Sequence, residues 1–276
     1  MIATSLLEGE YLKALIAAAI IGVVAPVVGT WIVLRRMANL GDTMSHGTLA
    51  GVGIAYAVGA NVLLGALGAG VVIAVLLILF SASQRLGHET IIAVMGSALF
   101  AIGIIVISRV DTTEELEHIL FGDVLQLTWS QIGFNVVIGS IAVGLVLLLF
   151  SELRLASFDH VQAEQVGVRV ELVQAVLVVL LAVVVVISLR TVGSIMSVSM
   201  LVTPAATARL VSPTLRRMTI VGIALGVSEA VAGVVLGRAL EVPPGATIGL
   251  LAAVVFAVTY VAALPRRMPH HHRPLG

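Results

Sequence analysis

Long apolar runs separated by short polar segments dominate the chain. Nine of these runs approach the length of about 20 apolar residues that a helix needs to cross the hydrocarbon core of a bilayer. Their predicted bounds are 12–34, 43–60, 61–83, 90–109, 132–151, 172–189, 192–211, 219–237 and 246–264. The pattern predicts an all-α fold, a polytopic integral membrane bundle of about nine transmembrane helices. It forms a single membrane domain over residues 1–276, with a flexible tail at 266–276.

Two of the nine runs are less apolar than the rest. The second begins directly after Asp42 and contains Ser45 and His46 among several glycines, and the seventh contains Pro204 with many Ser and Thr residues. Segments of this kind are often broken helices that line a cavity, where freed backbone groups find partners. The linker between the second and third runs is very short, which predicts a tight helical hairpin.

Glycines four residues apart recur in the predicted spans. The pairs are Gly47/Gly51, Gly222/Gly226, Gly233/Gly237 and Gly245/Gly249. This spacing lets helices approach closely in lipid. It predicts a compact bundle and carries no information about substrate.

Composition agrees with a lipid environment. Hydrophobic residues make up 59% of the chain and charged residues 11%, whereas a soluble domain is nearer half apolar and a quarter charged. The chain has no cysteine, which excludes disulfides and thiolate metal sites. Its formal net charge of zero argues against a nucleic-acid partner. The N-terminus has no basic region before its apolar run, so we interpret it as retained sequence rather than a signal peptide.

The distribution of basic residues predicts the orientation, because Lys and Arg favour cytoplasmic loops. With the N-terminus outside and the C-terminus inside, eleven of the fifteen basic residues fall inside and four outside. The inner set is Arg35, Arg36, Arg85, Arg154, Arg169, Arg209, Arg216, Arg217, Arg266, Arg267 and Arg273. The same orientation places the acidic stretch 111–123 outside and the long loop 152–170 inside.

The strongest candidate chemistry lies in the second span. Asp42 and His46 are four residues apart, so a helix places them on one face. Ionisable groups at membrane depth are costly and usually functional, and a carboxylate with an imidazole is a partial ligand set for zinc, manganese or iron. The alternative is that Asp42 only caps the helix N-terminus and His46 is an interior hydrogen-bonding group. Glu229, inside the eighth span, is a possible third ligand, an interhelical hydrogen-bonding group or a group facing water.

Several other segments have two interpretations each. The stretch 111–123, with His118, collects cations or docks a partner, or is simply a solvated acidic loop. His270–His272 resemble a weak metal-binding tract, but we favour a disordered tail. The loop 152–170 fits a cytosolic partner or an inert connector. The only lysine, Lys13, is not part of a P-loop, so the chain is not its own P-loop ATPase, and no His-Glu-x-x-His motif is present.

Four segments resemble the metal-ion ABC permeases for zinc, manganese and iron: Ile32–Val52, Leu120–Thr128, Val192–Leu210 and Val242–Leu250. The likeness covers nearly the whole chain in the expected order. It implies a single permease domain with a core shared with the cobalamin/siderophore-type importers. It also implies a homodimer in a prokaryotic cytoplasmic membrane, two cytosolic ATPase subunits and an extracytoplasmic metal-binding protein.

The resemblance also assigns roles to residues. Asp42 and His46 match the family's membrane metal-contact positions. Ser157–Val168 resembles the loop that seats in the ATPase, with Asp159, Ala163 and Gly167 matching its pattern. The sequences GDTMSH and LFGDVL look closer to the zinc branch, although Ser45-His46 also fits the manganese pattern.

We therefore expect a permease without ATPase activity and without a permanently bound cofactor. It would import a divalent metal ion, with zinc favoured and manganese or iron(II) as alternatives. The alternative from another class is a proton-coupled secondary cation transporter using Asp42, His46 and Glu229. Such carriers often show inverted repeats, and this chain has no convincing repeat.

Overall fold

The protein is a bundle of long helices. The computed structural model describes residues 9–81, 88–108 and 124–264. The long helices are α2 (Gly9–Leu34), α3 (Ala38–Ala57), α4 (Val62–Ser81), α5 (His88–Ile107), α7 (Trp129–Leu148), α10 (Val170–Val192), α11 (Ser194–Val211), α12 (Leu215–Ala239) and α13 (Pro244–Ala263). Short helices η1 (Val124–Gln126), α8 (Phe150–Phe158) and α9 (His160–Gln165) complete the set, and the described residues form no strand. The predicted all-α fold is therefore confirmed.

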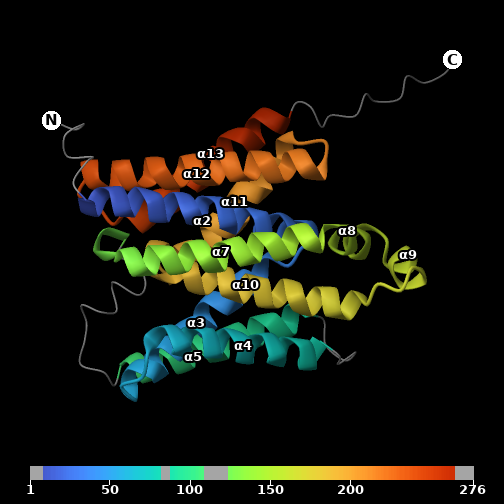
Figure 1. Cartoon of the computed structure of the whole chain (residues 1–276), viewed down its shortest axis with the longest axis horizontal. Coiled ribbons are helices and arrows are strands. Elements are labelled where there is room, and N and C mark those ends of the chain that lie inside the picture. The colour runs from blue at the N-terminus through green and yellow to red at the C-terminus, as the bar shows by residue number, and fades with distance from the viewer. Residues whose placement is uncertain (1–8, 82–87, 109–123, 265–276) are drawn as a thin grey trace.

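The helices lie side by side in layers. In Figure 1, α12 and α13 lie at one side of the bundle and α4 and α5 at the other, with α2, α7, α10 and α11 between them. Buried side chains of α2, including Ile21, Val28 and Trp31, form the centre of the main hydrophobic core, which continues through α10 and α11. Helices α8 and α9 lie at one end of the bundle, beyond the end of α7 (Figure 1).

Each of the nine predicted spans corresponds to one long helix. Five of them, α2, α7, α10, α12 and α13, have the length and apolar composition needed to cross a membrane. Shorter apolar stretches lie within α4, α5 and α11, namely Val62–Leu76, Thr90–Val106 and Met196–Val211. The number of helices that cross the bilayer therefore remains a prediction.

Two details of the less apolar runs differ from expectation. Helix α3 begins at Ala38, five residues before the predicted start, with Met37 at its N-cap and no side-chain cap bond. Asp42 lies in the second turn, so the interpretation of Asp42 as the N-cap is wrong. Neither α3 nor α11 is broken: α11 continues through Pro204, and the backbone breaks instead before it, at Gly193 with φ of 90°.

Glycines bring neighbouring helices into backbone contact, as their spacing predicts. In the α3–α4 hairpin, a Cβ at Gly65 would meet the Gly51 carbonyl oxygen at 2.5 Å. In the α2–α12 pair, a Cβ at Gly22 would lie 2.6 Å from the Gly226 carbonyl oxygen. Separations this short leave no room for a side chain, so these glycines fix the distance between the helices.

We expect Gly226→Ala to destabilise the bundle by about 1–3 kcal/mol, the usual cost of overpacking. A Cβ at Gly226 would come 2.6 Å from the Pro26 side chain. Gly133→Ala in α7 is the matched control, because nothing in the part of the chain that the structure describes lies within 4 Å of a Cβ there. The midpoint of thermal unfolding in detergent should fall for Gly226→Ala only. Equal midpoints would show that α2 and α12 can move apart without cost.

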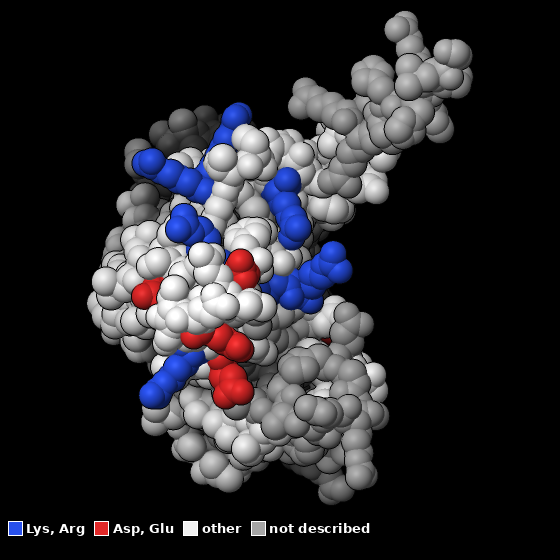
Figure 2. All heavy atoms as spheres, turned by 90° about the vertical axis from the view of Figure 1, so that its right-hand side faces the viewer, with Lys and Arg blue, Asp and Glu red and all other residues white. Residues whose placement is uncertain are grey.

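Basic residues gather at the end of the bundle that carries α8 and α9. They lie within α8 or near the ends of the other helices that meet there: Arg35, Arg36, Arg154, Arg169, Arg209, Arg216 and Arg217. Figure 2 looks onto this end and shows basic side chains spread around a smaller group of acidic ones. Lys13 lies near the start of α2 and Arg238 near the end of α12, and both therefore lie at the other end of the bundle. We call the first end the α8–α9 end.

Candidate metal-contact and coupling sites

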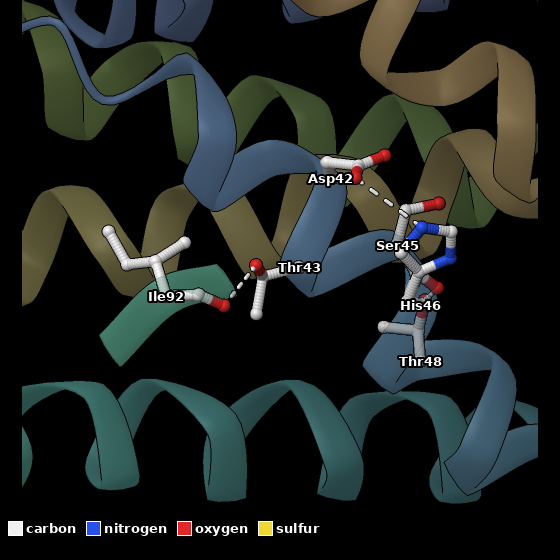
Figure 3. A network of polar contacts seen from close by, with 6 residues as sticks. All are labelled: Asp42, Thr43, Ser45, His46, Thr48 and Ile92. Atoms are coloured by element: carbon white, nitrogen blue, oxygen red, sulfur yellow. Dashed lines mark hydrogen bonds and ion pairs between the residues drawn. The ribbon is translucent and has the colours of Figure 1, made fainter. Parts of the chain in front are cut away.

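Asp42 and His46 form a pair on one face of α3. The His46 Nε2 and Asp42 Oδ2 atoms are 3.4 Å apart, as Figure 3 shows. The Asp42 side chain is 67% exposed and that of His46 is 32% exposed in the single chain. The helical spacing predicted from the sequence is therefore realised, and both groups are accessible from outside the chain's core.

The pair lines a pocket between α3 and α5. The pocket has a volume of about 310 Å³ and is lined by Asn39, Asp42, Thr43, His46, Ile92, Ala93, Gly96, Ser97 and Phe100. The imidazole of His46 packs edge-on against the Phe100 ring, with centroids 4.6 Å apart. This contact fixes the plane of the imidazole while leaving the pair open to the pocket.

Small residues hold α3 close to α5 beside the pair. The Thr43 hydroxyl donates a hydrogen bond of 3.1 Å to the Ile92 carbonyl oxygen, visible in Figure 3. A Cβ at Gly96 would come 2.9 Å from the Thr43 Oγ1 atom. The backbone of α3 at Asp42 is thus positioned by direct contact with α5.

The pair supplies two donors of the kind that divalent metal ions accept. A carboxylate oxygen and an imidazole nitrogen suit manganese, iron and zinc. Among the described residues, no group of three or more His, Cys, Asp or Glu side chains is present. The described residues of one chain therefore offer an incomplete ligand set, which would leave other coordination positions to water or to further groups.

Glu229 lies away from this pair, in α12, which packs mainly against α2, α11 and α13. Its side chain is only 3% exposed, and neither carboxylate oxygen has a hydrogen-bond partner among the described residues. In this conformation it is neither grouped with Asp42 and His46 nor exposed to water. Its role as a ligand stays a prediction.

The candidate ATPase-coupling loop, Ser157–Val168, contains α9. Its residues Asp159, Ala163 and Gly167 each contribute to the structure of this helix or of its ends. Asp159 is its N-cap, and its Oδ1 atom accepts a 2.8 Å hydrogen bond from the Gln162 backbone N–H. Ala163 is fully buried. Gly167 has φ of 81°, and the bonds Gly167 N–H to Glu164 O and Val168 N–H to Ala163 O close α9 as a Schellman motif.

Apolar side chains of the same segment are exposed at the end of the bundle. Phe158, Val161 and Val166 all lie on the surface of α8, α9 or the turn after it. They adjoin the charged groups Asp159 and Glu164. An exposed apolar group rimmed by polar residues is typical of a protein interaction site.

Arg35 bonds to the last turn of α8, a role that its sequence context did not indicate. Arg35 counted only as a basic residue for the orientation, but its Nη2 atom donates to the Ala156 carbonyl oxygen at 3.0 Å and its Nε atom to Ser157 Oγ at 3.2 Å.

The stretch 111–123 with His118, the tract His270–His272 and the tail 266–276 lie outside the described residues.

Comparison with known proteins places these features in a family. The sequence model of the ABC 3 transport family matches residues 10–263. The chain is 37% identical over 251 residues to the manganese transport system membrane protein MntC of Listeria monocytogenes, covering 91% of this chain and 90% of the relative. It is 35% identical over 255 residues to the manganese import system permease protein ScaB of Streptococcus gordonii, covering 92% of each.

A solved structure agrees with these relatives. The complex of PsaBC from Streptococcus pneumoniae with a Fab contains a chain with a TM-score of 0.86 and 32% identity, covering 94% of both chains. Fold and sequence therefore match over nearly the full length. The chain belongs to the ABC 3 transport family, as a multi-pass membrane permease subunit of a metal-ion ABC importer whose ATP hydrolysis is carried out by a separate subunit.

Proposed function

We propose that this permease carries Mn²⁺ into the cell as a homodimer, with Asp42 and His46 contacting the ion as it passes. The observation that supports this most is the carboxylate–imidazole pair facing a pocket on α3. The pair supplies two donors from one chain, so the same pair in a second copy would double the set. The relatives are named for manganese, and we therefore replace zinc, which the sequence favoured, by manganese.

The donor chemistry is compatible with this choice. Manganese accepts carboxylate, imidazole and water ligands. A cysteine thiolate would favour zinc, and the chain has no cysteine. Two protein donors per chain hold an ion loosely enough to release it. Iron(II) accepts the same donors and is the alternative cargo.

Uptake of metal by the complete complex in proteoliposomes tests this proposal. Mn²⁺ uptake should require ATP, the cognate ATPase and the extracytoplasmic metal-binding protein. Equimolar Zn²⁺ should compete poorly. Uptake of Zn²⁺ in preference to Mn²⁺ would contradict the choice of metal, and uptake without the ATPase would instead favour a proton-coupled carrier.

The segment formed by α8 and α9 is the proposed contact with the ATPase. Its apolar surface groups Phe158, Val161 and Val166 are exposed, and basic residues surround the same end of the bundle (Figure 2). An exposed segment that protrudes from this end is accessible to a cytosolic subunit. The extracytoplasmic metal-binding protein would then dock at the opposite end.

This assignment predicts that the α8–α9 end and the C-terminus face the cytoplasm and that the N-terminus faces outward. The chain has no cysteine, so single cysteines report the orientation. Ala60→Cys, in the exposed turn between α3 and α4, should react with an impermeant maleimide in intact cells. Pro213→Cys, in the turn between α11 and α12, should react only after permeabilisation. The reverse pattern would overturn the orientation.

A further inference from the structure

The turn between α2 and α3 is bonded to the last turn of α8. Arg35 occupies this turn, and its guanidinium donates to the Ala156 carbonyl oxygen at 3.0 Å and to the Ser157 hydroxyl at 3.2 Å. The Ser157 hydroxyl in turn donates to the Leu153 carbonyl oxygen at 2.6 Å. We call this set of bonds the Arg35 clasp.

The clasp supplies a donor to one carbonyl group at the C-terminal end of α8, that of Ala156. The last carbonyl groups of a helix lack intrahelical donors and carry partial negative charge, so a guanidinium is a favourable partner for them. The side chain is half-buried, and burial lowers the pKa of Arg35 from its ordinary value. An arginine nevertheless stays charged at neutral pH, so these are charge-assisted bonds.

Helix α8 is also held at its first turn, where Phe150 packs edge-on against Trp31 of α2, with ring centroids 5.4 Å apart. That contact joins α8 to the body of α2. The clasp is different because it joins the last turn of α8, immediately before the Asp159 cap of α9, to the residues that lead into α3.

The clasp lies next to the candidate metal-contact pocket. Arg35, Ala156 and Ser157 line a cavity of about 510 Å³. Asn39 and Ile92 line both this cavity and the pocket of Asp42 and His46. Asp42 is four residues after the start of α3, or about 6 Å along a helix that rises 1.5 Å per residue.

We propose that Arg35 is the positioning residue that transmits movement of the α8–α9 segment to the start of α3 and thereby to Asp42 and His46. The proposal rests on the proposed function, in which α8–α9 contacts the ATPase and the pair contacts the metal. A rigid guanidinium with two bonds to α8 moves the turn at Arg35 when the last turn of α8 shifts. Arg35 lies three residues before the start of α3 at Ala38, so a shift of this turn passes through the helix backbone to Asp42 and His46.

The test measures ATP hydrolysed per Mn²⁺ imported by the full complex with its binding protein in proteoliposomes. Arg35→Lys keeps the charge but cannot make both bonds in the same geometry, and Arg35→Gln removes the charge. Arg209→Gln is the matched control, because Arg209 donates its hydrogen bond of 3.1 Å to a backbone carbonyl at the same end of α2, that of Val33, and not to α8. Ser157→Ala removes one acceptor of the clasp with a minimal change of volume.

We expect both Arg35 variants to assemble with the ATPase and to hydrolyse at least five times more ATP per ion than the unmodified complex. Ser157→Ala should raise the ratio by a smaller factor, and Arg209→Gln should leave it unchanged. An unchanged ratio in the Arg35 variants would overturn the proposal. If those variants fail to assemble, Ser157→Ala decides, and an unchanged ratio there would overturn it equally.

Asp42→Asn in the same assay separates this proposal from the proposed function. Loss of uptake in Asp42→Asn with a normal ratio in the Arg35 variants would leave the metal-contact pair intact and remove only the clasp. Normal uptake in both Asp42→Asn and His46→Gln would leave the pair without a role in transport, and the movement that Arg35 transmits would then not reach a metal-contact site.

Discussion

Replacing Asp42 by asparagine is expected to reduce ATP-driven Mn²⁺ uptake by at least about tenfold, because alterations even to the outer shell of a metal site change affinity by 10–100-fold. The substitution preserves shape but removes the charge that faces the pocket. Asp42 is not the N-cap of α3, since that position is Met37. Loss of a helix cap therefore does not explain an effect of this variant.

His46→Gln should cause a loss of the same order, because an amide is a much poorer metal ligand than an imidazole. Ser97→Ala is the control for a general change in the pocket, which Ser97 also lines, and should retain uptake. Folded yield and binding of the ATPase should be normal in all three variants. Uptake close to that of the unmodified protein in both Asp42→Asn and His46→Gln would leave the pair without a role in transport.

Gly167→Val is expected to abolish coupled uptake nearly completely. The left-handed φ of 81° at this position costs a residue with a Cβ roughly 1–2 kcal/mol, and a β-branched residue is a particularly poor fit there. The Schellman bonds that end α9 would be lost or distorted, so Phe158, Val161 and Val166 would no longer be presented together. Uptake in proteoliposomes and co-purification of the ATPase measure the effect.

Gly167→Asn is the matched control for the conformational argument, since asparagine tolerates the left-handed region. It should keep most of the uptake that Gly167→Val loses. No atom of the described residues lies within 4 Å of a Cβ at this position, so a steric clash with them does not account for a difference. Equal uptake in the two variants would mean that the shape of this turn is unimportant for coupling.

The apolar pattern predicted the long helices, because each apolar run is about as long as a helix that crosses the hydrocarbon core of a bilayer. It placed the start of α3 five residues late, since the polar residues Asn39 and Asp42 and the flexible Gly41 interrupt the apolar pattern. The helix that contains these residues is stabilised by packing of α3 against α4, α5 and α11. Local sequence carries no trace of that packing.

The candidate site shows a similar limit. The spacing of Asp42 and His46 predicted their shared face because both lie on one helix. The position of Glu229 relative to that pair depends on how α12 packs, which a single sequence does not reveal. The role of Arg35 could not be predicted for the same reason, because its acceptors, Ala156 and Ser157, are more than a hundred residues away in the sequence. The metal could not be deduced from donors that manganese, iron and zinc share.

The central claim, that Asp42 and His46 contact manganese, is tested most directly by electron spin echo spectroscopy of Mn²⁺ bound to the permease–ATPase complex. The complex is loaded without the binding protein, held with a non-hydrolysable ATP analogue and freed of excess metal. The account predicts a nitrogen coupling from a coordinated imidazole that disappears in His46→Gln. Bound Mn²⁺ with no nitrogen coupling, or with the same coupling in His46→Gln, would contradict it.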